Sequence, residues 1–320
     1  MDRSHTLTGT YIGPVFFAFL IAALMTACLP QVNGGQAGDQ SSTTSPTQST
    51  VATAIPQLTV EILKNARYFM TGQDGITRDF QLVNGLYKSG SDPAAIGYAM
   101  VNLSDTIAFG DMNNDGLEDA AVLLAENYGG TGVFVSLVTV LNNYGTPVQV
   151  ASTLIDDRPS ISNLTIEQGS ITVDAVIHHI DDPMCCPTLP VKQFYRLMGN
   201  TLLLVHLTSQ TPGGGEHAIT IDTPEEKAEL AGSIPITGDI SISPFENTLA
   251  LSFYDGSGVV AFKGPLSVSA TDMGAPGQFD AIFESSALNL SSGSYRIEVA
   301  ELSMADGSVI AMDSVFVTLK

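Results

Sequence analysis

The sequence predicts a mainly β protein: an antiparallel β-rich middle domain that begins with one short helix, followed by a β-sandwich. Apolar residues alternate with polar ones along many segments, as in Phe279, Ala281 and Phe283, which is the period of a half-buried strand. Clusters of Gly, Pro, Asn and Ser separate these segments at short intervals. Short local connections favour antiparallel pairing, since parallel strands need a long crossover.

The middle domain is expected over residues 58–208. Its one helix is predicted at 58–69, "LTVEILKNARYF", where apolar residues have a loose helical spacing. The segment 132–143 is apolar nearly throughout, which predicts a central strand covered on both faces. The predicted strands are 78–88, 98–110, 119–127, 132–143, 162–168, 170–180, 191–199 and 201–209.

Residues 209–218, within "TSQTPGGGEHA", are predicted to form a Gly-rich hinge, which places a second domain at 219–320. About seven short strands are expected in that stretch, and this density predicts an immunoglobulin-like sandwich. Asp255-Gly256 and Asp306-Gly307 indicate hairpin turns. Examples of the predicted strands are 218–222, 248–255, 259–270, 277–285, 293–302 and 314–320.

The second domain also resembles a known family, the immunoglobulin-like domain associated with bacterial spore germination. The residues that carry the resemblance are Pro235, Gly238, Phe245, Glu246, Asp255, Gly258, Gly277 and Phe279. Ile234 departs from the pattern, because a small polar residue usually precedes the proline. The resemblance implies a non-catalytic extracellular module with no catalytic residues.

The N-terminus is predicted to be a targeting segment. Arg3 precedes the apolar run "PVFFAFLIAALMTAC", which is too short for a typical transmembrane helix. The ending "LMTAC" resembles the lipobox of bacterial lipoproteins, which implies a signal peptide at 1–27 and a lipid on Cys28. A plain secretory peptide or an uncleaved anchor remains the alternative. Residues 28–57 are rich in Ser, Thr, Gln and Gly and are expected to form a disordered tether, with a reach of roughly 30 Å.

Two further cysteines, Cys185 and Cys186, are adjacent in "DDPMCCPTLP". In an exported protein this arrangement suggests a vicinal disulfide that makes the turn rigid. Free thiols and an intermolecular bridge are the alternatives. Because the ring closes almost no loop, its contribution through chain entropy is expected to be small.

The charge balance excludes some classes of partner. The chain has 33 acidic and 12 basic residues, for a formal net charge of -21. Such a surface repels phosphate backbones, so nucleic-acid binding is not expected. It attracts divalent cations and basic partners.

The segment 109–124, "FGDMNNDGLEDAAVLL", has the spacing of a calcium loop. The predicted ligands are Asp111, Asn113, Asp115, Asp119 and the carbonyl of Leu117, with Gly116 allowing the sharp turn. The segment resembles the calcium loops of integrin-type FG-GAP repeats, with Asn113 in place of the usual aspartate. It occurs once, so a propeller is not expected. The alternative is a polar turn without metal.

Motifs for catalysis are sparse. The sequence has no G-x-S-x-G elbow, no H-E-x-x-H and no phosphate-binding glycine loop. Asp156-Asp157 and Asp181-Asp182 could act as glycosidase carboxylates, but both pairs lie beside prolines in turns. His178 and His179 fall on opposite faces of a strand, so "VIHHIDDPMCCPT" is expected to be a structural turn and not a metal site.

Together these observations predict a non-catalytic binding or structural protein of the bacterial envelope, outside the cytoplasm and anchored to the membrane through lipid on Cys28. Its partner is expected to be an envelope protein or a glycan, and its cofactor a structural Ca²⁺. The alternative function is an envelope hydrolase with its site in the middle domain.

Overall fold

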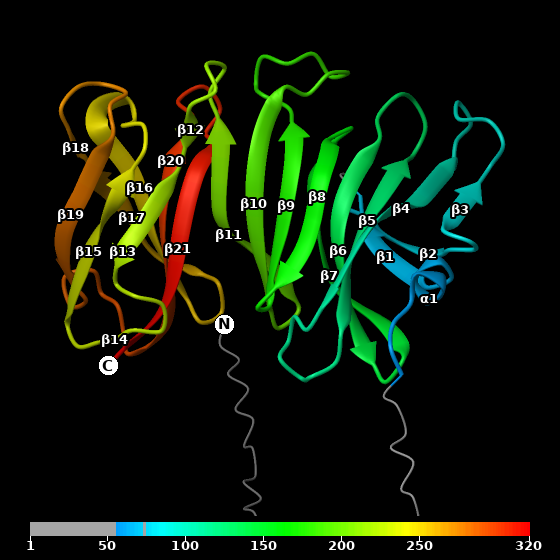
Figure 1. Ribbon diagram of the computed structural model, residues 1–320, viewed down its shortest axis with the longest axis horizontal. Coiled ribbons are helices and arrows are strands. Elements are labelled where there is room, and N and C mark those ends of the chain that lie inside the picture. The colour runs from blue at the N-terminus through cyan, green and yellow to red at the C-terminus, as the bar shows by residue number, and fades with distance from the viewer. Residues whose placement is uncertain (1–55, 73–74) are drawn as a thin grey trace, which may run out of the picture. The chain divides into compact units, whose positions relative to one another are not determined.

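The computed structural model describes residues 56–72 and 75–320 (Figure 1). The protein is mainly β, as predicted, and almost all of its strand pairs are antiparallel. The predicted signal peptide, Cys28 and nearly all of the predicted tether at 28–57 lie outside the described residues. Within the described ranges, no helix is both long and apolar enough to cross a membrane.

A five-stranded sheet forms the centre of the middle domain, in the order β3-β4-β5-β6-β7. β5 is buried along almost its whole length, because this sheet is covered on both faces. Alternate residues face different cores: Val122 packs with one hydrophobic cluster, and its neighbours Ala121 and Leu123 pack with another. The strands are β3 (Leu86–Ser89), β4 (Ala99–Gly110), β5 (Asp119–Asn127), β6 (Phe134–Asn143) and β7 (Thr146–Asp157).

One face of this sheet is covered by α1 (Val60–Lys64) and by the hairpin of β1 (Arg67–Thr71) and β2 (Thr77–Gln81). The helix is shorter than the predicted 58–69, since residues 67–71 pair with β2 instead of continuing it. Thr59 caps the helix, accepting a hydrogen bond from the amide of Ile62 at 3.2 Å. Asn65 ends the helix, and Tyr68 behind it is fully buried.

The other face is covered by β8 (Ser160–Glu167), β9 (Ser170–Ile177), β10 (Leu189–Met198) and β11 (Thr201–Gln210). These strands continue into the second domain as one ten-stranded sheet, in the order β17-β16-β20-β21-β11-β10-β9-β8, with β12 beside β11 and β14 beside β21. The link is the short pairing of β11 with β21, at His206 with Asp313 and Leu207 with Met312.

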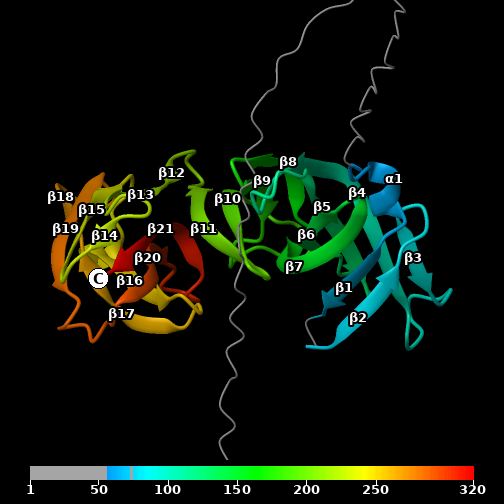
Figure 2. The same ribbon diagram turned by 90° about the horizontal axis from the view of Figure 1, so that it is seen from below.

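The second domain is a two-sheet sandwich, which confirms the predicted immunoglobulin-like fold. The four-stranded sheet β13-β15-β19-β18 packs on β16, β17, β20 and β21 around a core that includes Phe253, Phe279 and Ile297 (Figures 1 and 2). Its elements are β13 (Ile219–Thr223), β14 (Glu229–Leu230), β15 (Ser233–Ile240), a 3-10 turn (Phe245–Asn247), β16 (Thr248–Asp255), β17 (Val260–Ser267), β18 (Ser269–Ala270), β19 (Gly277–Glu284), β20 (Gly293–Leu302) and β21 (Val309–Leu319).

The segment 209–218, expected as a hinge, is a closed hairpin in the structure. β12 (Glu216–His217) pairs with the end of β11, and the amide of Thr211 donates to the carbonyl of Gly215 at 2.7 Å. Side-chain hydrogen bonds connect β11 and β12 to the sandwich: Nδ1 of His206 bonds Asp313 at 3.1 Å, and Nδ1 of His217 bonds Glu301 at 3.0 Å. The described residues, 56–72 and 75–320, belong to one compact unit.

Candidate functional site

The loop at 111–119, here called the acidic loop, is closed by its own hydrogen bonds. Asp111 accepts from the amides of Asp115 at 3.2 Å and Gly116 at 2.9 Å, while Asp115 accepts from the amide of Leu117 at 2.8 Å. Asn113 accepts from the amide of Asp115 at 3.0 Å and donates to its carboxylate at 2.8 Å. Gly116 has a φ of 86°, a left-handed conformation that a side chain would strain.

Asp119 joins the acidic loop to the C-terminal end of β6. Its side chain is fully buried, and its two oxygens accept from the amides of Met112 and Asn142, each at 2.9 Å. Burial raises the pKa of Asp119, with Asp115 and Asp111 adding to the effect, while the two backbone hydrogen bonds oppose it. Asp119 therefore stabilises the contact between the acidic loop and β6, with or without a bound cation.

Four of the five predicted calcium ligands thus contribute side-chain oxygens to this loop. The fifth predicted ligand is the backbone carbonyl of Leu117, a residue whose side chain is buried and whose amide donates to Asp115. Over residues 56–72 and 75–320, no group of three or more His, Cys, Asp and Glu side chains is arranged to hold a metal ion. Calcium at this loop remains a prediction.

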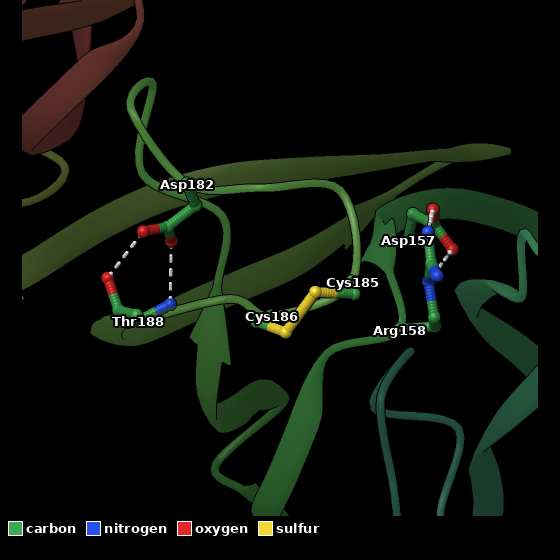
Figure 3. The surroundings of a disulfide bond; sticks show 6 residues. All are labelled: Asp157, Arg158, Asp182, Cys185, Cys186 and Thr188. Atoms are coloured by element: carbon green, nitrogen blue, oxygen red, sulfur yellow. Dashed lines mark hydrogen bonds and ion pairs between the residues drawn. A yellow bond between two sulfur atoms is a disulfide. The ribbon is translucent and has the colours of Figure 1, made fainter.

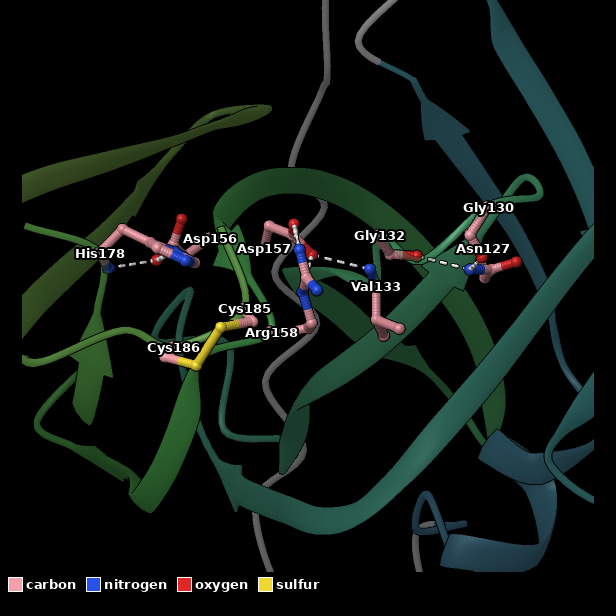
Figure 4. Close-up of polar contacts among 10 residues, drawn as sticks. All are labelled: Asn127, Gly130, Gly132, Val133, Asp156, Asp157, Arg158, His178, Cys185 and Cys186. Carbon is pink, nitrogen blue, oxygen red and sulfur yellow. Dashed lines mark hydrogen bonds and ion pairs between the residues drawn. A yellow bond between two sulfur atoms is a disulfide. The ribbon is translucent and has the colours of Figure 1, made fainter. Parts of the chain in front are cut away.

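The carboxylates considered for hydrolysis hold loops together (Figure 4). Asp156 accepts from the ring Nδ1 of His178 at 2.8 Å and from its amide at 2.5 Å. Asp157 accepts from the amide of Val133 at 2.7 Å and forms a two-bond pair with Arg158. Burial works against ionisation of Asp157, but the bonds from Arg158 and Val133 keep its pKa below the ordinary value. Neither group is left facing an open cavity as part of a carboxylate pair.

A separate cavity of about 410 Å³ lies between the β1–β2 hairpin and the central sheet. Glu126, which is only 4% exposed, lines it and accepts hydrogen bonds from the hydroxyls of Tyr128 and Ser136. Burial raises the pKa of Glu126. It is the one carboxylate among the described residues that line this cavity, so the carboxylate pair of a typical glycosidase is not present there.

The segment 178–190, here called the disulfide loop, connects β9 to β10. Asp182 closes this loop by accepting three hydrogen bonds. One comes from the amide of His179 at 2.8 Å. The other two come from the amide of Thr188 at 2.7 Å and from its hydroxyl at 2.8 Å (Figure 3). The largest contribution to the lowered pKa of Asp182 is the hydrogen bond from His179. Cys185 and Cys186 form a disulfide within the loop, and both residues are exposed.

A groove of about 680 Å³ lies beside the disulfide loop, and we call it the junction groove. Three segments far apart in the sequence form its walls: the disulfide loop, the β11–β12 hairpin and the loop that connects β20 to β21. Volumes of this size are typical of ligand sites, which often lie where domains meet.

Three large apolar side chains are exposed along the junction groove. Met184 is 68% exposed, Ile180 47% and Val309 37%, although each is large and apolar. Such a patch with a polar rim is typical of an interaction surface. Sequence reasoning did not find it, because only the Asp306-Gly307 turn and the cysteine pair gave a local signal.

The polar groups of the groove differ in how they are engaged. Asp182 is bonded within its own loop, and Asp306 accepts from the amide and hydroxyl of Ser308 at 3.1 and 2.9 Å. His178 and His217 each direct Nδ1 to a carboxylate, Asp156 and Glu301. The hydrogen bond with Asp156 is the main reason that the pKa of His178 is raised. No lysine or arginine is among the described lining residues.

Comparison with known proteins identifies the second domain. Residues 218–308 match a family described as the immunoglobulin-like domain of bacterial spore germination. The match agrees with the sandwich topology and with the resemblance carried by Pro235 and Phe279. No curated protein matches the chain. The chain therefore carries, at residues 218–308, an immunoglobulin-like domain of the bacterial spore germination kind.

Proposed function

We propose that this protein is a non-catalytic binding protein of the bacterial envelope, held on the outer side of a membrane by lipid on Cys28. The observation that carries this proposal is the spore-germination immunoglobulin-like domain, a non-catalytic type of domain that suggests an extracytoplasmic protein. The lipobox-like "LMTAC" and the adjacent cysteines support the same compartment. The junction groove is the proposed binding surface.

The lipid anchor has a direct test. Cells that produce the full chain are grown with radiolabelled palmitate, and the label is measured on the purified protein. We expect label and membrane association for the parent and loss of both for Cys28→Ala, whereas Cys185→Ser/Cys186→Ser keeps both. An unlabelled, freely soluble parent protein would contradict the proposal.

We also propose that Ca²⁺ binds the acidic loop. The support is the D-x-N-x-D-G-x-x-D spacing and the placement of Asp111, Asn113 and Asp115 in one tightly turned loop. Millimolar Ca²⁺ is expected to raise the melting temperature of the parent, as for weak extracellular sites. The change should vanish in Asp111→Ala/Asp115→Ala but persist in Asp255→Ala, which alters another aspartate turn. An unchanged melting temperature in the parent would rule the site out.

The second candidate function is an envelope hydrolase, and the buried Glu126 with its raised pKa is the feature that favours it. The test is turnover of glycoside, peptide and ester substrates by the purified full chain. Our proposal predicts no turnover. Turnover that Glu126→Gln abolishes and Asp156→Asn leaves intact would replace it with the hydrolase.

A further inference from the structure

We propose that the junction groove binds an extended segment of a partner protein, with aliphatic side chains in the groove and lysine or arginine on either side. This inference rests on the proposed binding function and adds the chemical class of the ligand. Three features carry it: the exposed apolar lining, the charge of the rim and the state of the polar groups.

The apolar lining fits aliphatic side chains. Met184, Ile180 and Val309 are exposed, and Leu189, Pro190 and Ile310 also line the groove. Methionine adapts its shape to different aliphatic groups and is common on surfaces that bind peptides. Covering these three exposed side chains removes apolar surface from water, which favours association.

The charges around the groove favour a basic partner. Asp306 and Glu216 are exposed near it, and the carboxylate of Asp181 is 90% exposed. No lysine or arginine is among the described residues of the lining, and the whole chain has a formal net charge of -21. An approaching cationic segment is therefore attracted, while an acidic segment is repelled.

The polar groups give a peptide backbone suitable partners. The hydroxyls of Thr188 and Ser308 already donate to Asp182 and Asp306, so their oxygens can accept from peptide amides, while the side-chain amide of Gln210 in the lining can donate to a carbonyl. The carboxylates of Asp182 and Asp306 are engaged by their own loops. These groups can orient a segment while the apolar contacts and charges provide the affinity.

Other ligand classes fit less well. An anionic ligand would meet no lysine or arginine among the lining residues that the structure describes. Among the described residues no metal-binding group of three His, Cys, Asp or Glu exists. A glycan usually stacks on an aromatic ring, and no Phe, Tyr or Trp is among the described lining residues.

The experiment uses the full chain in phosphatidylcholine vesicles, which carry no net charge and so do not attract a basic probe. The probe is a short fluorescent peptide of alternating leucine and alanine with two lysines at each end. A matched peptide has glutamates in place of the lysines. Binding is measured by fluorescence anisotropy, with empty vesicles as the background.

We expect saturable binding of the lysine peptide, and at least about tenfold weaker binding of the glutamate peptide. Raised salt should reduce the difference between the two. Met184→Ser and Val309→Ser should each weaken binding of the lysine peptide, by at least about tenfold for Met184→Ser. Met273→Ser is the matched control, because Met273 is 72% exposed but lies outside the groove, and it should bind like the parent.

Several results would overturn the inference: no saturable binding to the parent, equal losses in Met184→Ser and Met273→Ser, or displacement of the probe by a soluble cell-wall glycan at lower concentration than by unlabelled peptide. Both methionines are exposed, so the variants are expected to fold, and their melting temperatures verify this. A chain that carries palmitate but binds no peptide contradicts only this inference. An unlipidated chain contradicts the proposed function instead.

Discussion

The acidic loop and the disulfide loop differ in what they leave for a partner. In the acidic loop, the carboxylates of Asp111, Asp115 and Asp119 all accept hydrogen bonds from nearby backbone amides. In the disulfide loop, Asp182 closes the backbone, while Met184 and Ile180 remain exposed beside a groove. The loop with the stronger sequence motif is thus largely occupied with its own structure. The disulfide loop has the weaker sequence motif, but it forms one wall of the junction groove.

The largest expected effect lies in the acidic loop. Asp119→Ala should lower the free energy of unfolding by about 3 kcal/mol, because the buried amides of Met112 and Asn142 lose their acceptor. Denaturant unfolding of the two proteins measures the change. Glu118→Ala, on the exposed neighbour, should be close to the parent. Equal stability of Asp119→Ala and the parent would show that Asp119 does not hold this loop.

A smaller, local effect is expected for Asp182→Ala. The change removes the acceptor of three hydrogen bonds that close the disulfide loop, from His179 and Thr188. Amide hydrogen exchange should become faster in residues 179–188 and stay unchanged in residues 111–119. Asp181→Ala serves as the control, since Asp181 has an exposed carboxylate. Faster exchange spread over the whole middle domain would mean that the two loops are not independent.

The hydrogen bond between His178 and Asp156 predicts that the free energy of unfolding depends on pH. The pKa of His178 is raised above its ordinary value of 6.5, so the protonated pair stabilises the fold fully below pH 6.5. This stabilisation is lost as the pH rises through the raised pKa. As the pH rises above 6.5, the free energy of unfolding should decline less in His178→Gln than in the parent. His179→Gln should decline like the parent, and the opposite ranking of the two variants would contradict the assignment.

The smallest effect is expected for the disulfide. Replacing Cys185 and Cys186 by serine should lower the free energy of unfolding by about 1 kcal/mol or less, because the bond joins neighbouring residues and closes almost no loop. Denaturant unfolding measures this change. A loss as large as that of Asp119→Ala would show that the disulfide, and not Asp182, determines the structure of the loop.

Much of the fold could be predicted from periodicity. Residues 119–127 were expected as a strand and form β5 with the same bounds, because every residue there is apolar or buried by both neighbouring layers. β7 (Thr146–Asp157) was missed, since Pro147 and its polar residues obscure the alternation in a strand only partly covered. The helix prediction was too long because pairing with β2 overrides local spacing at residues 67–71.

The candidate site was less predictable than the fold. The carboxylates Asp156 and Asp182 could be singled out by type, but their bonds to His178 and Thr188 depend on how the strands pair. The junction groove combines the disulfide loop with residues 303–310, and no local pattern in either segment indicates the other. They come together because β11 pairs with β10 on one side and with β21 on the other.

The central claim is that the disulfide loop, and not the acidic loop, forms the binding surface. The most direct test is amide hydrogen exchange of the full chain, measured with and without the lysine-flanked peptide. We expect slower exchange on peptide addition in residues 178–190 and 303–310, and no change in residues 111–119. Protection confined to residues 111–119, or protection nowhere at a saturating peptide concentration, would contradict it.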